Sequence, residues 1–471
     1  MRIYLLWIVV WALMIYAWRN WFVGVLGLML LSVVMQRQDF PTHLVGIPGL
    51  NPFNMLLLST VSAWFVHLHA GGRGIDLPNS VKILLMIVLS VLLATYLRGV
   101  FDLKSIPHSP FLGRRYRRPS PMEFTGEFVI NRIKFVLPAL LLFDACRKRG
   151  RVLVAAGAII VCALAYALMV IKHVPVGSLF GGDFMQYRHR IDRDIGLMAI
   201  DMSMLLAAAF WATVSFAVLV LRKKWQRLAM CGVLAVLFLG MTLCHSRGSY
   251  IGFVAAGLVF AIARWRSLLA VLPVLIIVVC VAFPSIPDRM LMGVGEIDAT
   301  GQSYNNIDEI TAGRFTDLWP AAIEQFEKGP LIGFGALACR RTELRDRWLE
   351  IAGAPTHPHN AYLELLLDMG ILGTLPLLIM YGGIFAITWK LFRIRNDSFA
   401  AGIGGMGLAS ITVLLVTAMG AQSFYPTQST ILSWCTWALS MRLLLDVQRR
   451  PAAATAYARP PRVQPRPGTA L

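Results

Sequence analysis

LLAVLPVLIIVVCVAF, at residues 268–283, is the stretch that decides the fold, because it contains no charged side chain. Arg264 and Arg266 precede it, and a long hydrophilic segment follows it. A helix needs roughly 20 residues to cross the hydrocarbon core of a bilayer, and apolar runs of about this length recur along almost the whole chain. In lipid every backbone polar group must be paired within its own segment, so these runs are predicted to be helices.

The composition supports the same interpretation. The 471 residues are 57% hydrophobic and only 15% charged, whereas soluble proteins carry about 25% charged residues. The formal net charge is +19, which in a soluble protein would suggest nucleic acid as a partner. Here the cations cluster in short connections between apolar runs, so we expect no nucleic-acid binding. The seven cysteines are scattered and predict neither a disulfide framework nor a metal site.

We therefore predict an all-α polytopic membrane protein with about 12 transmembrane helices and one large, partly helical loop on its outer face. The candidate spans are 3–18, 21–35, 52–68, 81–97, 127–144, 152–171, 196–221, 226–244, 247–263, 268–283, 362–392, 403–422 and 428–446. One of the first two segments is expected not to cross fully. The predicted units are transmembrane helices over 1–283, a loop or cap over 284–361, transmembrane helices over 362–448 and a disordered cytoplasmic tail over 449–471.

Basic residues in alternate connections assign one face as cytoplasmic, as the positive-inside rule requires. These connections contain Arg147-Lys148-Arg149, Arg222-Lys223-Lys224, Arg264 with Arg266, and Arg393 with Arg395. The opposite face then receives 98–126, 172–195, the turn at 245–247, 284–361 and 421–427. Arginines in these outer connections run against the rule, and anion binding is the reason we expect for them.

Arg247 lies in Ser246-Arg247-Gly248, in a tight turn between two spans. An arginine at membrane depth is costly, and its planar guanidinium suits bidentate phosphate recognition; the alternative is an arginine that snorkels to the interface. Arg314 begins an amphipathic stretch of the long loop that ends at Glu327, and its alternative is a solvated charge.

Arg188, Arg190 and Arg193 directly precede a span on the outer side, at near-helical spacing. They form either an anion clamp or salt bridges with Asp192 and Asp194. Arg114, Arg115, Arg117 and Arg118 are expected to contact anionic head groups, which makes membrane lipids partners.

His357-Pro358-His359-Asn360 stands where the long loop re-enters the membrane. Pro358 restricts itself and the preceding residue, and Asn360 is suited to cap a helix that begins at Ala361. A histidine at a helix N-terminus favours the neutral imidazole that a general base requires. The alternatives are a purely structural turn, or a zinc site completed by Glu364 or Asp368.

Three motifs then coincide in order. They are Ser246-Arg247-Gly248, then Gly313-Arg314 with Trp319 and Pro330-Leu-Ile-Gly-Phe-Gly335, then His359-Asn360-Ala-Tyr362-Leu363-Glu364 with Asp368-Met-Gly370-Ile-Leu-Gly373. In this combination the region from about 240 to 375 resembles the O-antigen ligase/polymerase superfamily of bacterial inner-membrane glycosyltransferases, and most of all the O-antigen ligase of lipopolysaccharide assembly.

The resemblance implies transfer of O-antigen polysaccharide from undecaprenyl diphosphate to the lipid A-core oligosaccharide at the periplasmic face of the inner membrane. It implies inverting chemistry without a metal or other cofactor. Arg247 would hold the donor diphosphate, helped by Arg314 or by Arg188, Arg190 and Arg193. His359, or its neighbour His357, would deprotonate the acceptor.

Two rival functions remain open from the sequence. Within the superfamily, the chain could be an O-antigen polymerase or a protein O-oligosaccharyltransferase, because the donor motifs do not identify the acceptor. The alternative of another class is a lipid-linked sugar transporter. A transporter predicts inverted repeats and charged residues near the bilayer centre, and the sequence contains no evident internal repeat.

Overall fold

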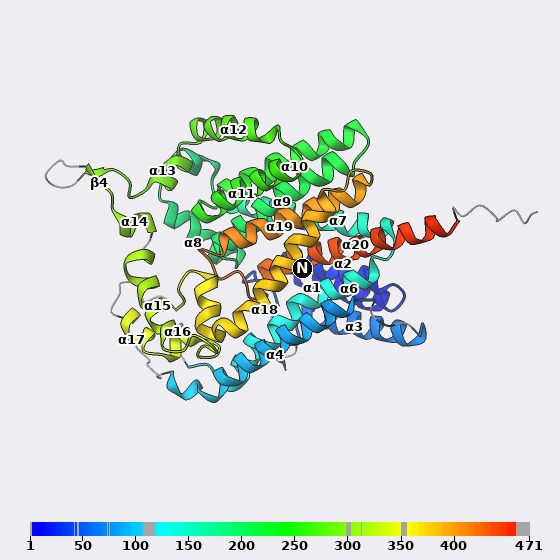
Figure 1. The fold of residues 1–471 in the computed structure, drawn as a ribbon, viewed down its shortest axis with the longest axis horizontal. Coiled ribbons are helices and arrows are strands. Elements are labelled where there is room, and N and C mark those ends of the chain that lie inside the picture. Colours follow the sequence, from blue (N-terminus) through cyan, green and yellow to red (C-terminus); the bar gives the residue numbers. More distant parts are fainter. Residues whose placement is uncertain are drawn as a thin grey trace, which may run out of the picture.

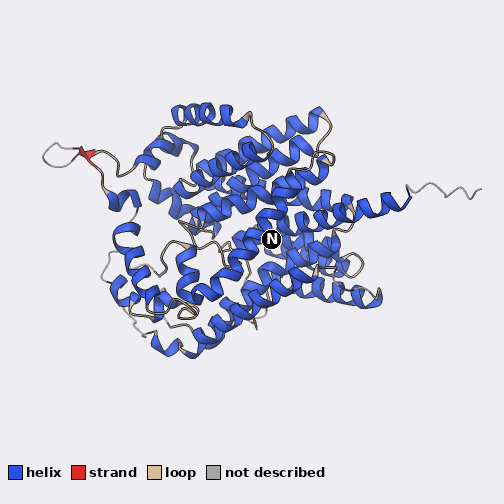
Figure 2. Ribbon diagram, viewed as in Figure 1, coloured by secondary structure: helices blue, strands red, loops and turns tan. Residues whose placement is uncertain are grey.

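The computed structural model describes residues 2–41, 43–44, 47–72, 74, 76–106, 118–297, 303–311, 313–349 and 356–457. This part of the chain is helical apart from two short hairpins (Figures 1 and 2). One hairpin pairs β1 (His43–Leu44) with β2 (Ile47–Pro48), and the other pairs β3 (Glu296–Ile297) with β4 (Ser303–Tyr304). Arg114, Arg115 and Arg117, expected to contact lipid, lie outside the described residues.

A helix forms in each of the predicted apolar runs, since each run supplies enough apolar side chains to favour burial or lipid. These helices are α1 (Arg2–Ala17), α2 (Trp21–Ser32), α3 (Pro52–Ala70), α4 (Asn79–Phe101), α6 (Asn131–Ala145), α7 (Arg149–His173), α9 (Ala199–Leu219), α10 (Lys224–Thr242), α11 (Arg247–Ala263), α12 (Leu268–Ala282), α18 (Ala361–Phe392), α19 (Ser398–Thr417) and α20 (Ile431–Tyr457).

Shorter elements connect the long helices. They are η1 (Leu103–Ser105), α5 (Pro121–Thr125), η4 (Gly126–Ile130), η5 (Val176–Phe180), α8 (Phe184–Ile195), α13 (Ser285–Leu291), α14 (Ile307–Thr311), η6 (Arg314–Leu318), α15 (Trp319–Glu327), α16 (Ala338–Arg341), α17 (Leu344–Leu349) and η7 (Gln428–Thr430). The helical stretch predicted to run from Arg314 to Glu327 is formed by η6 and α15 together.

Seven helices in the described part are long and apolar enough to cross a membrane. An eighth candidate arises if α12 and α13, which are bent by 102° relative to each other, form one span. The all-α membrane class is therefore confirmed. The count of about 12 crossings, the loop over 284–361 as an outer cap and the assignment of the two faces stay predictions.

The end of α20 extends into the segment 449–471 that the sequence predicts to be disordered. Arg449 donates from both terminal nitrogens to Asp76, at 2.5 and 2.8 Å, and the alanines that follow have high helix propensity. α20 consequently continues to Tyr457, and residues 458–471 lie outside the described range.

The centre of the bundle is α19, which is buried along almost its whole length and packs against α9, α11, α18 and α20 (Figure 1). The glycines of α19 allow the neighbouring helices to approach this closely. A methyl group at Gly404 would come within 2.6 Å of the backbone nitrogen of Phe392, and one at Gly407 would lie 2.5 Å from the Ser440 hydroxyl. Small residues of this kind let membrane helices approach closely, which maximises van der Waals contact where no hydrophobic effect drives association.

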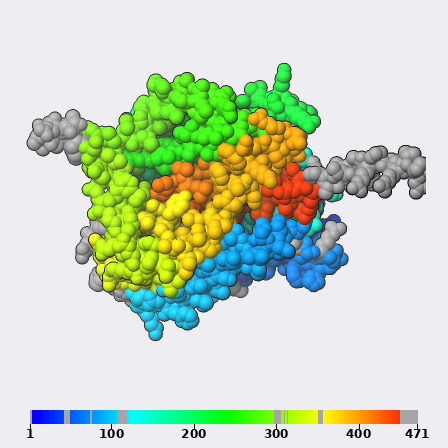
Figure 3. All heavy atoms as spheres, in the orientation of Figure 1, coloured from blue at the N-terminus to red at the C-terminus, as the bar shows by residue number. Residues whose placement is uncertain are grey.

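The segment 303–349 gathers at one end of the bundle, where α14 to α17 lie (Figure 1), and forms a layer over that end in the space-filling view (Figure 3). A small apolar core that includes Leu318, Ala322, Leu344 and Trp348 holds the layer together, and Leu367 of α18 belongs to the same core. The layer is therefore packed onto the membrane helices.

A break in α18 fixes this layer in place. Gly370 adopts φ 64° and ψ −171°, a conformation that is open to glycine alone. The loop before α16 pairs with the backbone groups that the break exposes. Gly335 N–H donates to the backbone carbonyl of Asp368 at 2.7 Å, and Ile371 N–H donates to the carbonyl of Pro330 at 2.8 Å. The sequence predicts a span over 362–392 but gives no sign of the break, which only the structure shows.

Replacing Gly370 by alanine tests the role of the break. The new methyl group would clash with the Leu331 backbone and lie 2.5 Å from the Gly333 nitrogen. We expect Gly370→Ala to destabilise the protein by about 2 kcal/mol or more, seen as a lower thermal midpoint in detergent. Gly382→Ala, in the same helix with nothing within 4 Å of the added group, is the control. Equal midpoints for both variants would contradict the proposed role of the break.

Candidate functional site

Six basic side chains from segments far apart in the sequence converge at the end of the bundle that the layer covers. They come from α8, the turn between α10 and α11, α13, the start of η6 and the turn before α18. They are Arg188, His245, Arg247, Arg289, Arg314 and His359, and each lies close enough to others of the group to interact with them electrostatically. We call these six residues the cationic cluster.

The turn that carries His359 is strained and tightly braced. His359 has φ 50°, in the left-handed region that a branched or ring-bearing residue rarely adopts. Its backbone N–H donates to Nδ1 of His357 at 3.2 Å, and the Trp319 indole donates to the Pro358 carbonyl at 2.9 Å. Asn360 caps α18, as predicted, by accepting from the backbone N–H groups of the second and third helical residues. Strain held in this way is typical of functional sites.

His359 is neutral at physiological pH. Burial lowers the pKa of its imidazole to about 4, and the charges of Arg314 and Arg188 act in the same direction. The sequence attributed neutrality to the helix N-terminus, whereas the structure makes burial the main cause. No hydrogen bond to another described residue occupies the ring nitrogens. One of them is therefore available to accept a proton.

Arg314 and Arg188 are largely buried cations without a direct ion pair among the described residues. Neither forms an ion pair or a hydrogen bond with another described residue, and Nε of Arg314 is buried without a partner. Burial lowers the pKa of both guanidinium groups, and Asp192 is the acid whose charge acts on Arg188. A buried cation without a partner is unfavourable, so an anion bound between these two side chains would be stabilised.

Arg247 supports the wall of the site. Nε donates to the Arg289 carbonyl and Nη1 to the Ile310 carbonyl, both at 2.6 Å, while Nη2 donates to the Met292 carbonyl at 3.0 Å. These bonds tie the segment between α13 and α14 to the start of α11. The structure thus shows Arg247 positioning its neighbours, and its predicted contact with a diphosphate stays a prediction.

Of the three arginines on α8, the structure brings only Arg188 into the cationic cluster. Residues two apart on a helix face nearly opposite directions, so Arg190 points away from Arg188. Arg193 pairs with Asp194 at 2.7 Å, which is the salt-bridge alternative. Arg190 and Arg193 line a separate polar hollow of about 580 Å³. A clamp made by all three is therefore not what the structure shows.

Arg289 and His245 complete the cluster, and the sequence analysis did not select either. Arg289 donates to the His245 carbonyl at 3.4 Å. Burial, and then the charges of Arg289 and Arg188, lower the pKa of His245 to about 4, and its Nε2 lies 3.1 Å from the Ser178 hydroxyl. One signal for Arg289 was available in the sequence: it is an arginine just past the outer end of an apolar run.

The carboxylates proposed as zinc ligands are engaged elsewhere. Glu364 accepts from Gln422 at 2.8 Å, and Asp368 accepts from the Tyr425 hydroxyl at 2.8 Å. Arg132 lies over the Tyr425 ring, 3.5 Å from its centroid, and interacts electrostatically with both acids. The described ranges contain no group of three His, Cys, Asp or Glu side chains that could hold a metal ion.

An apolar cavity of about 370 Å³ adjoins the cationic cluster. It lies between α10, α11, α12 and α13, and its lining includes Phe238, Tyr250, Leu272, Ile286 and Met290. Met290 follows Arg289 directly, and Tyr250 lies one helical turn after Arg247. The site therefore combines the cationic cluster, a neutral imidazole and an apolar cavity, which suits an anion carried on an apolar chain.

Comparison with known proteins agrees with the motifs in the sequence. Residues 232–378 match the family model described as O-antigen ligase. A protein of Rickettsia bellii (strain RML369-C) described as a "Putative polysaccharide ligase" is 27% identical over 207 residues, which is 42% of this chain and 47% of that relative. The match thus spans about half the length of the relative. The predicted resemblance is confirmed for the region that contains every residue of the cationic cluster except Arg188.

The neutrality of His359 can be measured by reaction with diethylpyrocarbonate, which modifies the uncharged imidazole. With peptide-resolved mass spectrometry, we expect His359 to lose reactivity only as the pH falls to about 4, because its pKa is lowered from the ordinary 6.5. Arg314→Gln removes one nearby cation, so the midpoint should move up towards 6.5. Arg190→Gln removes an equal charge from the far face of α8 and should leave the midpoint unchanged. If the reactivity of His359 in the wild-type protein had its midpoint near pH 6.5, this description of the site would be contradicted.

Proposed function

We propose that this multi-pass membrane protein, whose residues 232–378 match the O-antigen ligase family, is a glycosyltransferase. It transfers O-antigen polysaccharide from undecaprenyl diphosphate to the lipid A-core oligosaccharide, at the periplasmic face of the bacterial inner membrane. The observation that carries the proposal is the neutral His359 beside buried arginines that no described carboxylate pairs with.

The donor diphosphate would bind between Arg188, Arg289 and Arg314. Guanidinium groups make strong, bidentate hydrogen bonds with phosphate oxygens, and the burial of these groups raises the strength of each interaction. The apolar cavity between α10 and α13 would receive the first part of the polyprenyl chain. Arg247 would hold Arg289 in register through the Arg289 carbonyl.

The reaction would be a single displacement with inversion at the anomeric carbon. An acceptor hydroxyl oxygen attacks that carbon, the bond from the carbon to the diphosphate oxygen breaks, and the electron pair leaves with the diphosphate. The hydroxyl proton goes to a ring nitrogen of His359, which can accept it because the ring is uncharged. The products are the glycosylated acceptor and undecaprenyl diphosphate.

Charge stabilisation in this step would come from the arginines, without a metal or other cofactor. Negative charge develops on the departing diphosphate in the transition state, and preorganised cations in a site that excludes water stabilise such charge strongly. The arginine side chains are already assembled by the fold, so the protein does not reorganise to form the pocket.

The acceptor distinguishes this proposal from its rivals within the superfamily. A polymerase would extend a carrier-linked chain, and a protein oligosaccharyltransferase would modify a protein hydroxyl. The deciding experiment expresses the protein in a bacterial host that lacks its own ligase but makes carrier-linked O-polysaccharide, and identifies the molecule to which polymer becomes attached. Polymer on lipid A-core supports the proposal, whereas polymer found only on carrier or on protein identifies the rival.

In that host we expect His359→Ala to lower ligation by about 10²–10⁴-fold, the usual contribution of a general base. His357→Ala is the matched variant, since Nδ1 of His357 accepts from the backbone of His359 and braces the turn. Ligation should fall less in His357→Ala than in His359→Ala. Immunoblots for the tagged protein must show equal amounts of both variants. Unchanged ligation by His359→Ala would overturn the general-base assignment.

Arg289 provides a separate test of donor binding. Arg289→Gln removes a buried cation, and loss of charge-assisted hydrogen bonds to phosphate should lower activity at limiting donor by about tenfold or more. Arg190→Gln, on the polar hollow outside the cluster, is the control and should retain activity. If the two substitutions have the same effect, the diphosphate does not bind where we place it.

A further inference from the structure

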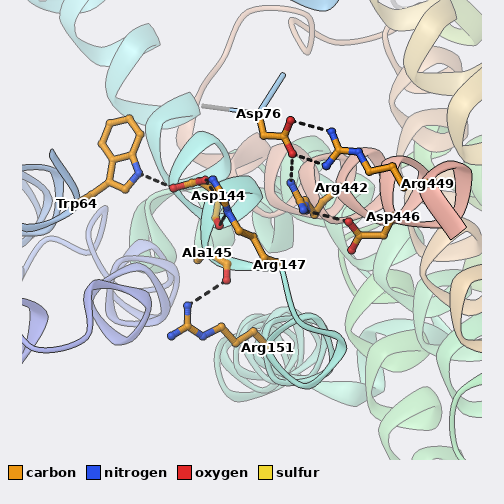
Figure 4. A network of polar contacts seen from close by, with 9 residues as sticks. All are labelled: Trp64, Asp76, Asp144, Ala145, Arg147, Arg151, Arg442, Asp446 and Arg449. Atoms are coloured by element: carbon orange, nitrogen blue, oxygen red, sulfur yellow. Dashed lines mark hydrogen bonds and ion pairs between the residues drawn. The ribbon is translucent and has the colours of Figure 1, made fainter. Parts of the chain in front are cut away.

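A second polar cavity lies at the opposite end of the bundle from the cationic cluster. α7 begins beside it at Arg149 and ends near α8 at His173. The cavity measures about 360 Å³ and is lined by Trp21, Trp64, Arg147, Lys148 and Arg151, among others. Figure 4 shows part of this region, with Trp64, Asp144, Arg147 and Arg151 around the end of α6 and the start of α7.

One basic residue of the cavity is already neutralised. Asp144 is buried and accepts from the Trp64 indole at 3.0 Å, and its other oxygen accepts from Nε of Arg147 at 3.1 Å. Both carboxylate oxygens are therefore engaged. The pair of Asp144 and Arg147 forms a fixed wall and adds no net charge to the cavity.

Lys148 and Arg151 give the cavity an uncompensated charge. Neither forms an ion pair with any residue in the described ranges. Lys148 is exposed, and Arg151 donates to the Ala145 carbonyl at 3.2 Å and lies 5.3 Å from the Phe22 ring centroid. Two cations thus remain at this hollow after the internal pair is counted.

Two other arginines at the same end of the bundle, Arg149 and Arg442, do form ion pairs. Arg149 pairs with Asp397, and Arg442 pairs with Asp446 at 3.0 Å and with Asp76 at 3.3 Å (Figure 4). The fold therefore supplies carboxylates to cations that hold helices together. Lys148 and Arg151 have no such partner among the described residues, and they line the same cavity as the neutralised Arg147.

The position of the cavity identifies the class of anion. α3 and α7, two of the helices long enough to cross a membrane, end and begin here, so the cavity lies at the level of lipid head groups. Trp21 and Trp64 are the amphipathic aromatic residues that favour this depth, and Leu68 adds an apolar edge. A soluble anion would gain nothing from these apolar surfaces.

We propose that this cavity binds the phosphodiester head group of an anionic phospholipid. Lys148 and Arg151 hold the phosphate, the indoles of Trp21 and Trp64 lie against the glycerol region, and the pair of Asp144 and Arg147 shapes the floor. Basic pockets between membrane helices recognise acidic head groups in this way. The site lies far from the cationic cluster and does not depend on the proposed function.

The experiment measures stabilisation of the purified full chain in a neutral detergent. Dioleoylphosphatidylglycerol should raise the thermal midpoint of the wild-type protein, and dioleoylphosphatidylcholine should raise it less. Lys148→Gln with Arg151→Gln should weaken the apparent affinity for phosphatidylglycerol about tenfold or more. The control is Lys223→Gln with Lys224→Gln, which removes the same charge from exposed positions beside α10 and should bind as the wild type does.

The possible outcomes are distinct. If both double variants lose the effect equally, the lipid is attracted by surface charge in general and the proposed site is wrong. If glycerol 3-phosphate or inorganic phosphate gives the same stabilisation, the cavity binds a soluble anion and the proposal is also wrong. Should the double variant not fold, Lys148→Gln alone, at an exposed residue that makes no side-chain cap, replaces it, with the number of bound lipids counted by native mass spectrometry.

Discussion

The structure depends on the requirement that a helix crossing hydrocarbon must leave no backbone group unpaired. In α18 a glycine-only conformation at Gly370 interrupts the ladder of helical hydrogen bonds and leaves backbone groups to be paired by another segment. The loop around Pro330 to Gly335 supplies the missing partners, so its backbone becomes part of the membrane domain. That single junction fixes the layer of short helices over the end of the bundle. Arg314 belongs to this layer, and Trp319 of the layer donates to the Pro358 carbonyl beside His359, so the positions of both residues depend on it.

The cationic cluster shows the cost of assembling such a site. Burial opposes the charge on Arg188, Arg289 and Arg314, and none of the three forms an ion pair with a residue that the structure describes. Arg247 donates to backbone carbonyls, which stabilises the wall, whereas Arg188 and Arg314 donate to no residue that the structure describes. The same surroundings keep His359 uncharged. One physical cause, burial beside positive charge, therefore underlies both the proposed anion site and the neutral imidazole.

Some arginines of this protein are held in ion pairs, and others are not. At the end with Asp76, Asp144 and Asp397, Arg147 pairs with Asp144 close by in the sequence, whereas Arg149 pairs with Asp397 and Arg442 with Asp76, which are distant in the sequence. At the other end Arg341 pairs with Asp102 at 2.7 Å, whereas Arg188 and Arg314 form no ion pair with a residue that the structure describes. A buried cation with a nearby carboxylate stabilises the fold, whereas a buried cation without one is unfavourable and would be stabilised by a bound anion. This distinction identifies both the proposed donor site and the proposed lipid site.

The sequence by itself determined the helices, since apolar runs, their length and the cap at Asn360 act locally along the chain. It also indicated which connections carry the arginines and histidines of the candidate site, because charge against the positive-inside rule is visible without coordinates. Tertiary structure alone decided that Arg188 faces inward while Arg190 and Arg193 do not, that Arg247 binds carbonyls, and that Arg289 joins the cluster. It also decided that Glu364 and Asp368 pack with Arg132 and Tyr425. These outcomes depend on contacts between segments far apart in the chain, and helix rotation and packing, which no local pattern fixes, determine them.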